Sequence, residues 1–180
     1  HVAHILDVLQ KHNISYKVLV VNNNIGNTMI DGEHIENDDR QFIPSDFRVE
    51  LKQQEIDDVI TKKYPRYWDL FHNCKYHCYT DKKCCLNVMR QSYIEQCVSS
   101  HISEEYEKVI AISADFNIIR DIPIHDIIQL KERELMVSDM NHARGYTNGL
   151  YIGTSNSVKK TMNHFDSIKD FDIYSYEHLI

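Results

Sequence analysis

The chain has 180 residues, 42% of them hydrophobic, which suits one globular domain with a sizeable core. Its formal net charge of −7 argues against general nucleic-acid binding, because no basic stripe is available to displace counterions from phosphates. No apolar run approaches the ~20 residues of a membrane span and no signal peptide is recognisable, so we expect no transmembrane segment.

The N-terminal part of the sequence predicts a helix followed by a strand. Apolar residues recur at the i, i+3, i+4, i+7 spacing of an amphipathic helix over residues 2–12, and Asn13 is a suitable stop. Residues 16–21 form the predicted strand, which ends in a polar run beginning with Asn22 and Asn23. Because no strand precedes the helix, we expect that the first strand of an α/β unit is missing from the chain.

The next segment is polar and acidic. We expect residues 22–48 to form loops around at most one weak strand. Apolar positions then predict a helix over 50–63 that closes at Tyr64, because a residue before proline avoids the helical conformation. The aromatic cluster within residues 67–71 is more typical of a core than of a binding surface.

All five cysteines lie between residues 74 and 97, and two interpretations of them are open. The segment His72–Cys85 holds two histidines and four cysteines, which is the ligand chemistry of a zinc site. The adjacent Cys84 and Cys85 would be strained as ligands of one tetrahedral ion. We therefore expect that Cys74, Cys78, Cys84 and Cys85 do not share a zinc ion. Five cysteines without a signal peptide favour free thiols in a reducing compartment, which predicts a cytoplasmic protein.

The second half of the sequence alternates helical and short apolar segments. The predicted elements are helices over 84–101, 125–131 and 156–166, and strands over 108–114, 134–138 and 149–153. Together with the strand at 16–21, these strands are expected to share one mostly parallel sheet flanked by helices. The fold class is therefore α/β, in a single domain over residues 1–180.

An acid follows the strand predicted at 108–114. A short apolar run that breaks abruptly is typical of a strand buried on both faces, and Asp115 stands at its C-terminal end, where open α/β sheets bind ligands. Asn117 supplies a second oxygen, and in an extended chain residues two apart face the same way. The two oxygens are therefore candidate ligands of one cation. The alternative is that Asp115 caps a turn while Asn117 is solvated.

A second strand also ends at an acid. The strand predicted at 134–138 ends at Asp139. Farther along, three of the five glycines fall within residues 145–153, which indicates tight turns or the close approach of a ligand to backbone.

This order of elements resembles glycosyltransferases of the GT-A type, most closely the small ones of large DNA viruses and of bacterial surface-polysaccharide clusters. The resemblance runs from Val2 to Leu179 and rests mainly on the strand that ends in Asp115-Phe116-Asn117 and on the segment Tyr146–Gly153 before a helix. It implies a GT-A-like (Rossmann-like) fold, a nucleotide-sugar donor, and a glycan or protein-linked acceptor. It also implies the host cytoplasm as the location if the protein is viral.

The resemblance implies a metal site and a base. Asp115 matches the first acid of the family's D-x-D-like motif, and Asn117 replaces the second acid, as ligands of Mn²⁺ or Mg²⁺. Such a cation offsets the charge that develops when a sugar–diphosphate bond breaks. Asp139 is the candidate base for the acceptor hydroxyl if the reaction inverts the anomeric centre. His164 and His178 are candidates to complete the metal shell, with ordinary structural roles as the alternative.

The resemblance also implies donor contacts. Asn148 and Gly149 match a family turn beside the donor sugar and acceptor, while Asn22 and Asn23 are expected near the nucleotide. Arg144 is a candidate for a forked contact to phosphate or a sugar hydroxyl, or is a solvated loop residue.

Two other classes of function remain open. One is a zinc-stabilised or thiol-bearing interaction module centred on His72–Cys85. The other is a phosphate-handling α/β hydrolase that uses Asp115 as a nucleophile, which is weakened because Asn117 replaces the second acid usual for that chemistry.

Overall fold

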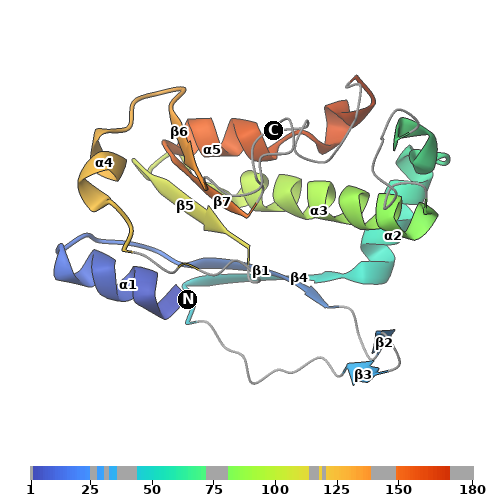
Figure 1. The fold of residues 1–180 in the computed structure, drawn as a ribbon, viewed down its shortest axis with the longest axis horizontal. Coiled ribbons are helices and arrows are strands. Elements are labelled where there is room, and N and C mark those ends of the chain that lie inside the picture. Colours follow the sequence, from blue (N-terminus) through green and yellow to red (C-terminus); the bar gives the residue numbers. More distant parts are fainter. Residues whose placement is uncertain are drawn as a thin grey trace.

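The structure is a computed structural model, and it describes residues 2–24, 28–30, 33–35, 44–71, 81–113, 118, 121–138 and 149–170. Over these ranges the fold is mixed α/β, as the sequence predicted, with helices packed around two separate sheets and a small hairpin (Figure 1). No helix within the described ranges is both long and apolar enough to cross a membrane.

The N-terminal helix agrees with its prediction. Helix α1 (Val2–Lys11) presents Ile5 and Val8 to the core. Beyond its last residue the chain turns away at Asn13, which adopts a positive φ of 53°, and the Ile14 amide donates to the Leu9 carbonyl. Asparagine tolerates this left-handed conformation better than most residues, so the predicted stop is confirmed.

The first sheet pairs two parallel strands, β1 (Leu19–Asn24) and β4 (Phe47–Lys52), with Leu19 opposite Phe47. Between them in sequence, β2 (Thr28–Ile30) and β3 (Glu33–Ile35) form an antiparallel pair. The expectation of loops with at most one weak strand over 22–48 is therefore wrong. Strand β4 alternates apolar and charged residues, the pattern of a half-exposed strand, and its charged positions are exposed.

The second sheet has the order β5-β7-β6, built from β5 (Val109–Ile112), β6 (Leu135–Val137) and β7 (Leu150–Gly153). These strands occupy three predicted ranges, but both pairings are antiparallel. The prediction of one mostly parallel sheet is thus wrong for the described strands, because only β1 and β4 are parallel. A short apolar run indicates only that a strand is covered on both faces. An antiparallel strand between two layers of helices meets the same condition, so the run does not reveal the direction of the strand.

The other helices are α2 (Gln53–Lys63), α3 (Lys82–His101), α4 (Ile124–Gln129) and α5 (Ser155–Met162), with 3₁₀ helices η1 (Tyr67–Phe71) and η3 (Phe165–Asp170). Helix α2 begins later than predicted because its first expected residues belong to β4. Helix α5 ends earlier than predicted, and η3 follows after Asn163 and His164.

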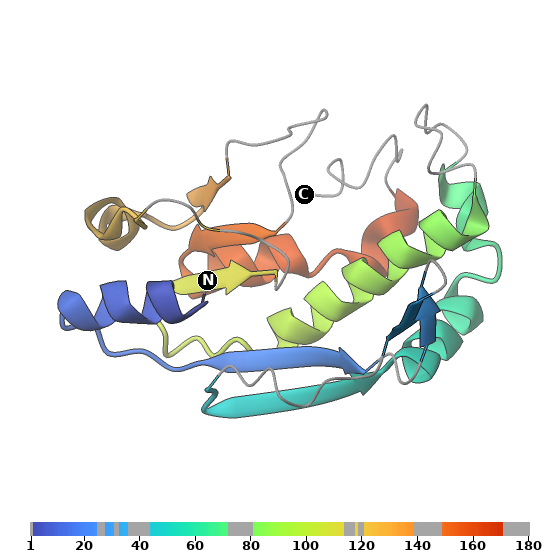
Figure 2. The ribbon, with the colours of Figure 1, turned by 60° about the horizontal axis from the view of Figure 1, so that its bottom comes forward.

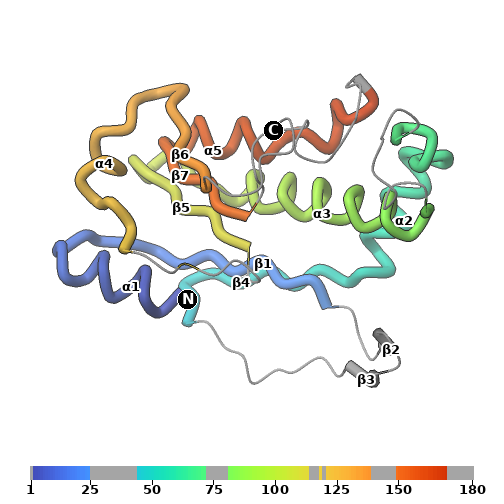
Figure 3. The backbone as a smooth tube through the Cα atoms, viewed as in Figure 1, coloured from blue at the N-terminus to red at the C-terminus, as the bar shows by residue number. Residues whose placement is uncertain are grey.

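Helices cover both faces of the β5-β7-β6 sheet. Consecutive residues of a strand point to opposite faces, and in β7 Ile152 contacts the apolar faces of α1 and α4 while Tyr151 packs with Val158 and Met162 of α5. Figure 2 and the backbone trace in Figure 3 show α3 and α5 side by side on the second of these faces. In this part of the molecule the sheet is therefore a middle layer between helices.

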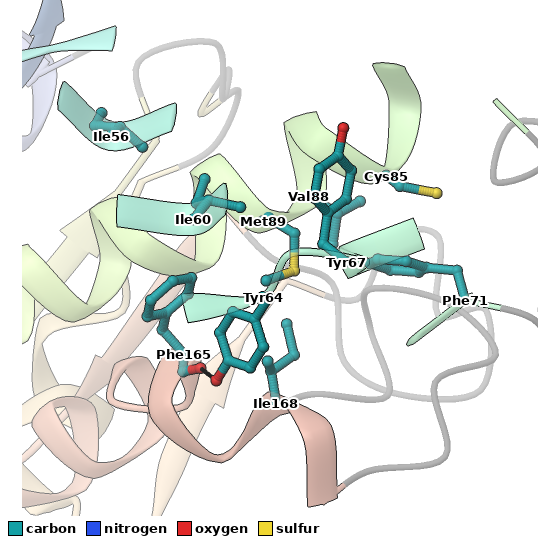
Figure 4. Packing of buried hydrophobic residues seen from close by; sticks show 10 residues of the cluster. All are labelled: Ile56, Ile60, Tyr64, Tyr67, Phe71, Cys85, Val88, Met89, Phe165 and Ile168. Carbon is teal, nitrogen blue, oxygen red and sulfur yellow. Dashed lines mark hydrogen bonds between the residues drawn. The ribbon is translucent and has the colours of Figure 1, made fainter. Parts of the chain in front are cut away.

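A second core lies among α2, η1, α3 and η3, away from the sheet. Figure 4 shows its side chains converging, with the Tyr64 hydroxyl donating to the Phe165 carbonyl at 2.7 Å. Tyr67 and Phe71 of η1 are buried here, which confirms the prediction that the aromatic cluster belongs to a core. At its margin Arg90 of α3 makes a forked contact to Asp57 of α2, with N–O distances of 2.7 and 2.6 Å.

We expect Gly153→Ala to destabilise the fold by about 1–3 kcal/mol, the usual cost of adding a methyl group to a tightly packed site. A Cβ at Gly153 would lie 3.0 Å from the Glu134 carbonyl oxygen, 3.2 Å from Leu135 Cδ1 and 3.4 Å from Ser157 Cβ. The Glu134 carbonyl is a backbone atom and Leu135 belongs to β6, so neither can move away from the added methyl group without shifting that strand. Urea unfolding of both proteins measures the effect, and an unchanged midpoint would mean that β6 and β7 are free to separate.

Candidate functional site

The ends of three strands lie side by side at one edge of the β5-β7-β6 sheet. Strands β5 and β6 are both antiparallel to β7, so they run in the same direction on either side of it. Their C-terminal ends therefore lie beside the N-terminal end of β7, with Ile112 opposite Leu150 and Val137 opposite Tyr151. We call the edge marked by Ile112, Val137 and Leu150 the exit edge.

A glycine turn is fixed to the end of β5 at the exit edge. The Ser113 amide donates to the Gly149 carbonyl at 2.8 Å, directly beyond the last paired residues of β5 and β7. Gly149 is buried and has a φ of 117°, a conformation that side chains other than glycine rarely adopt. The predicted site residue Gly149 therefore lies at the exit edge, where only glycine fits without strain.

The other predicted residues of this region lie outside the described residues: Asp115, Asn117, Asp139, Arg144 and Asn148. Their contacts remain predictions. Three of them are close in sequence to described ends of the exit edge. Asp115 is two positions after Ser113, Asp139 directly follows Ser138, and Asn148 directly precedes Gly149.

Asn22 and Asn23 lie at the carboxyl end of the parallel pair β1 and β4, opposite Glu50 and Leu51. Asn22 Nδ2 donates to Glu50 Oε2 at 2.8 Å, and Asn23 Nδ2 donates to Gln53 Oε1 at 3.3 Å. Polar side chains thus gather where β4 enters α2, at the kind of strand end where α/β proteins bind ligands.

The oxygen of Asn23 is enclosed in the protein. Among the described residues its Oδ1 has no hydrogen-bond partner. An enclosed acceptor without a donor costs stability, on the order of 1–3 kcal/mol, and such atoms call for a further polar group. Sequence reasoning identified Asn23 but missed Glu50 and Gln53, because it did not predict β4; the alternating charges of that strand were the available signal.

The two groups of site residues belong to different sheets. The structure brings Asn22 and Asn23 together on β1, and it brings Gly149 to the end of β5. In Figures 1 and 2, β5 is the strand of the second sheet that lies nearest to β1.

The described residues alone do not form a metal site. No group of three or more His, Cys, Asp or Glu side chains within the described ranges is placed to hold a metal ion. The predicted ligands Asp115 and Asn117, and His178, lie outside those ranges, so the Mn²⁺ or Mg²⁺ site remains a prediction. The ring of His164 is 4% exposed and faces the Thr161 carbonyl and the Glu95 carboxyl. His164 therefore lies inside the helical core, and its place in a metal shell remains a prediction.

The thiols that the structure describes have buried or half-buried positions. Cys85 is 1% exposed and packs in the core with Tyr67 and Phe71 (Figure 4). Its neighbour Cys84 is half-buried and points in another direction, since consecutive helical residues diverge by about 100°. Burial raises the pKa of the Cys97 thiol, which makes it a poor nucleophile at neutral pH. The other members of the proposed zinc or thiol segment, residues 72–80, lie outside the described residues.

No protein-family model, no curated protein and no solved structure matches this chain.

Proposed function

We propose that the protein is a metal-dependent glycosyltransferase of the GT-A type, which moves a sugar from a nucleotide-sugar donor to a glycan or protein-linked acceptor. The observation that carries the proposal is the exit edge. Because β5 and β6 run the same way beside antiparallel β7, the segments that begin after Ser113 and Ser138 and the turn at Gly149 start from one place. The chemistry-bearing residues of the sequence belong to these segments.

The roles follow from the chemistry of sugar transfer. Asp115 and Asn117 supply the oxygen ligands that hard cations prefer. A bound Mn²⁺ or Mg²⁺ supplies charge that offsets the diphosphate leaving group. Asp139, which follows β6 in sequence, is the proposed base for the acceptor hydroxyl. Arg144 is proposed to contact the diphosphate, because a guanidinium matches phosphate oxygens with two donors.

The remaining residues are assigned to the donor. Gly149, with its positive φ, lets the backbone approach a sugar closely, and Asn148 precedes it. Asn22 and Asn23 are proposed to lie near the nucleotide. The amide nitrogen of Asn22 donates to Glu50, which leaves its carbonyl oxygen as an acceptor for a nucleotide N–H or O–H group, whereas the enclosed Asn23 is assigned a supporting place beside it.

A thermal-shift screen of nucleotide sugars with and without Mn²⁺ tests the proposal. A ligand that binds only the folded protein at a hundredfold excess over its Kd adds about 2.7 kcal/mol of stability. We expect one nucleotide sugar to raise the melting temperature in Mn²⁺, and the shift to vanish in chelator. The matching nucleoside without phosphates is the control and should give little shift.

Two outcomes would contradict the proposal. One is that no nucleotide sugar raises the melting temperature, with or without Mn²⁺. The other is that the best ligand is a simple phosphomonoester whose phosphate is released without any acceptor, which would favour the hydrolase alternative.

A further inference from the structure

Strands β1 and β5 are each the last strand of their sheet, and in the described part of the chain each is paired on one side only. In Figures 1 and 2, β1 lies between β4 and β5, and β5 lies between β1 and β7, so the unpaired sides of β1 and β5 face each other. Figure 2 shows both strands running in the same direction. The strands therefore follow the order β4, β1, β5, β7, β6, with the hydrogen bonding interrupted between β1 and β5.

The register of β5 with β7 shows which backbone groups of β5 are on its unpaired side. The Ser113 amide donates to the Gly149 carbonyl. In an antiparallel pair the residues that bond across alternate with residues that face away, so the odd-numbered residues of β5 bond to β7. The N–H and C=O groups of Ile110 and Ile112 face away from β7 and have no partner among the described residues.

Strand β1 has the same arrangement on its side of the interruption. The Phe47 amide donates to the Val18 carbonyl, and in a parallel pair this places the backbone groups of the even-numbered residues of β1 toward β4. The N–H and C=O groups of Leu19, Val21 and Asn23 therefore face away from β4, toward β5. Two rows of backbone donors and acceptors thus face each other without bonding to each other.

Both strands are also less buried than β7, which is paired on both sides. In β7, Tyr151 and Ile152 are 2% and 1% exposed, whereas every residue of β1 and β5 is half-buried. Helices already cover both faces here. On one face α3 contacts β1, and its Val98 shares a cluster with Val109 of β5; on the other face α1 packs against Ile110. The exposure that remains is on the unpaired sides.

The segments that enter the two strands lie near each other. The pKa of Lys17 is raised mainly by its hydrogen bond to Asp46, and Tyr106 adds to the effect, so Tyr106 is close enough to influence the Lys17 charge. Lys17 is two residues before β1, and Tyr106 is three residues before β5. Strands in a sheet are about 4.8 Å apart, so one intervening strand would separate β1 from β5 by about 10 Å. The long side chains of lysine and tyrosine can meet across that distance.

We propose that one extended segment binds between β1 and β5, parallel to both, and joins the two sheets into one. The occupant is a strand that leads into the N-terminal end of α1. Parallel neighbours are connected by a crossover helix, and α1 covers this part of the molecule and leads into β1. Because α1 and α3 cover its two faces, the occupant is an apolar run, with a length between the 4 residues of β5 and the 6 of β1. This is the place for the first strand that the sequence leads us to expect.

Amide hydrogen exchange of the 180-residue chain tests whether the two sides are unpaired. The Val21 and Ile110 amides should exchange at least about tenfold faster than those of Val20 and Ala111, which bond to β4 and β7. Equal protection of both sets would mean that the sides already have partners, and it would overturn the proposal. Protection that grows with protein concentration would assign the place to a second copy of the chain and would also overturn it.

An N-terminal extension tests the occupant. It consists of about six alternating valines and isoleucines, the usual length of a strand, followed by a short glycine and serine linker before residue 1. The extended protein should melt at least about 4 °C above the 180-residue chain, and its Val21 and Ile110 amides should become protected. The control is the same extension with proline at two central positions, which cannot donate to a neighbouring strand and should give neither effect.

Two results of the extension experiment would contradict the proposal. One is that the valine–isoleucine and the proline extensions behave alike, in melting temperature and in the exchange of the Val21 and Ile110 amides. The other is that the same valine–isoleucine peptide protects these amides when it is added as a separate molecule but not when it is linked to residue 1. Linkage raises the effective concentration of the peptide, so a failure of the linked form alone would mean that the occupant does not lead into α1.

Discussion

Replacing Asp115 with Asn is expected to lower sugar transfer about a thousandfold and to leave the fold intact. The change keeps the shape of the side chain and removes the charge proposed to hold the cation, at a cost of several kcal/mol of transition-state stabilisation. Asn117→Ala should be milder, because water can replace a neutral ligand. The measurement is transfer, or donor hydrolysis, by each protein across a manganese titration.

Asp126→Asn is the matched control for this experiment. Asp126 is an exposed acid in the first turn of α4, and its replacement should change activity little. Equal activities of wild type and Asp115→Asn would rule out the metal assignment, and so would full activity in chelator. If Asp115→Asn instead unfolds, Asp115 is a structural turn residue, which is the alternative that the sequence left open.

The second large effect is expected from Phe165→Ala, which should destabilise the fold by roughly 3–5 kcal/mol. Phe165 is 1% exposed and makes edge-on ring contacts with Tyr64 and Tyr93 at centroid distances of 5.4 and 5.1 Å. Its removal leaves a cavity between α2, α3 and η3 that this rigid core cannot close (Figure 4). Urea or thermal unfolding gives the free-energy difference.

Phe47→Ala is the control of the same chemistry at a surface position. Phe47 is 58% exposed at the start of β4, so its truncation should change stability by less than about 0.5 kcal/mol. Similar losses for the two variants would contradict the packing described for Phe165.

The sequence predicted those elements whose apolar residues follow one clear period. Helix α1 and strands β5 and β7 lie close to their predicted ranges because each buries a continuous apolar stripe or run. Strand β4 was missed because its residues were divided between the loops predicted over 22–48 and the helix predicted over 50–63, although their alternation of charged and apolar residues is typical of a half-exposed strand. The predicted direction of β7 was wrong, because a strand that is buried on both faces is apolar whether it is parallel or antiparallel to its neighbours.

The candidate site was predictable where the backbone conformation requires one particular residue type, as a positive φ requires glycine. The glycines of residues 145–153 indicated tight turns, and the resemblance singled out Gly149; its positive φ at the exit edge gives the physical reason for a glycine there. Glu50 and Gln53 were not predicted, because their contacts with Asn22 and Asn23 depend on the pairing of β1 with β4. Such contacts between distant segments have no local signal in a single sequence.

Strands β4 and β5, two of the edge strands in the described part of the chain, differ in how they would meet another molecule of the protein. Strand β4 carries Arg48, Glu50 and Lys52, charges that discourage a further chain from adding to its edge. Strand β5 (Val109–Ile112) has no charge, is half-buried along its length, and within the described strands pairs only with β7. An uncharged strand with one paired side is a template for intermolecular β-pairing. In concentrated solution, intermolecular pairing at β5 would therefore involve the same four residues that lead into the exit edge.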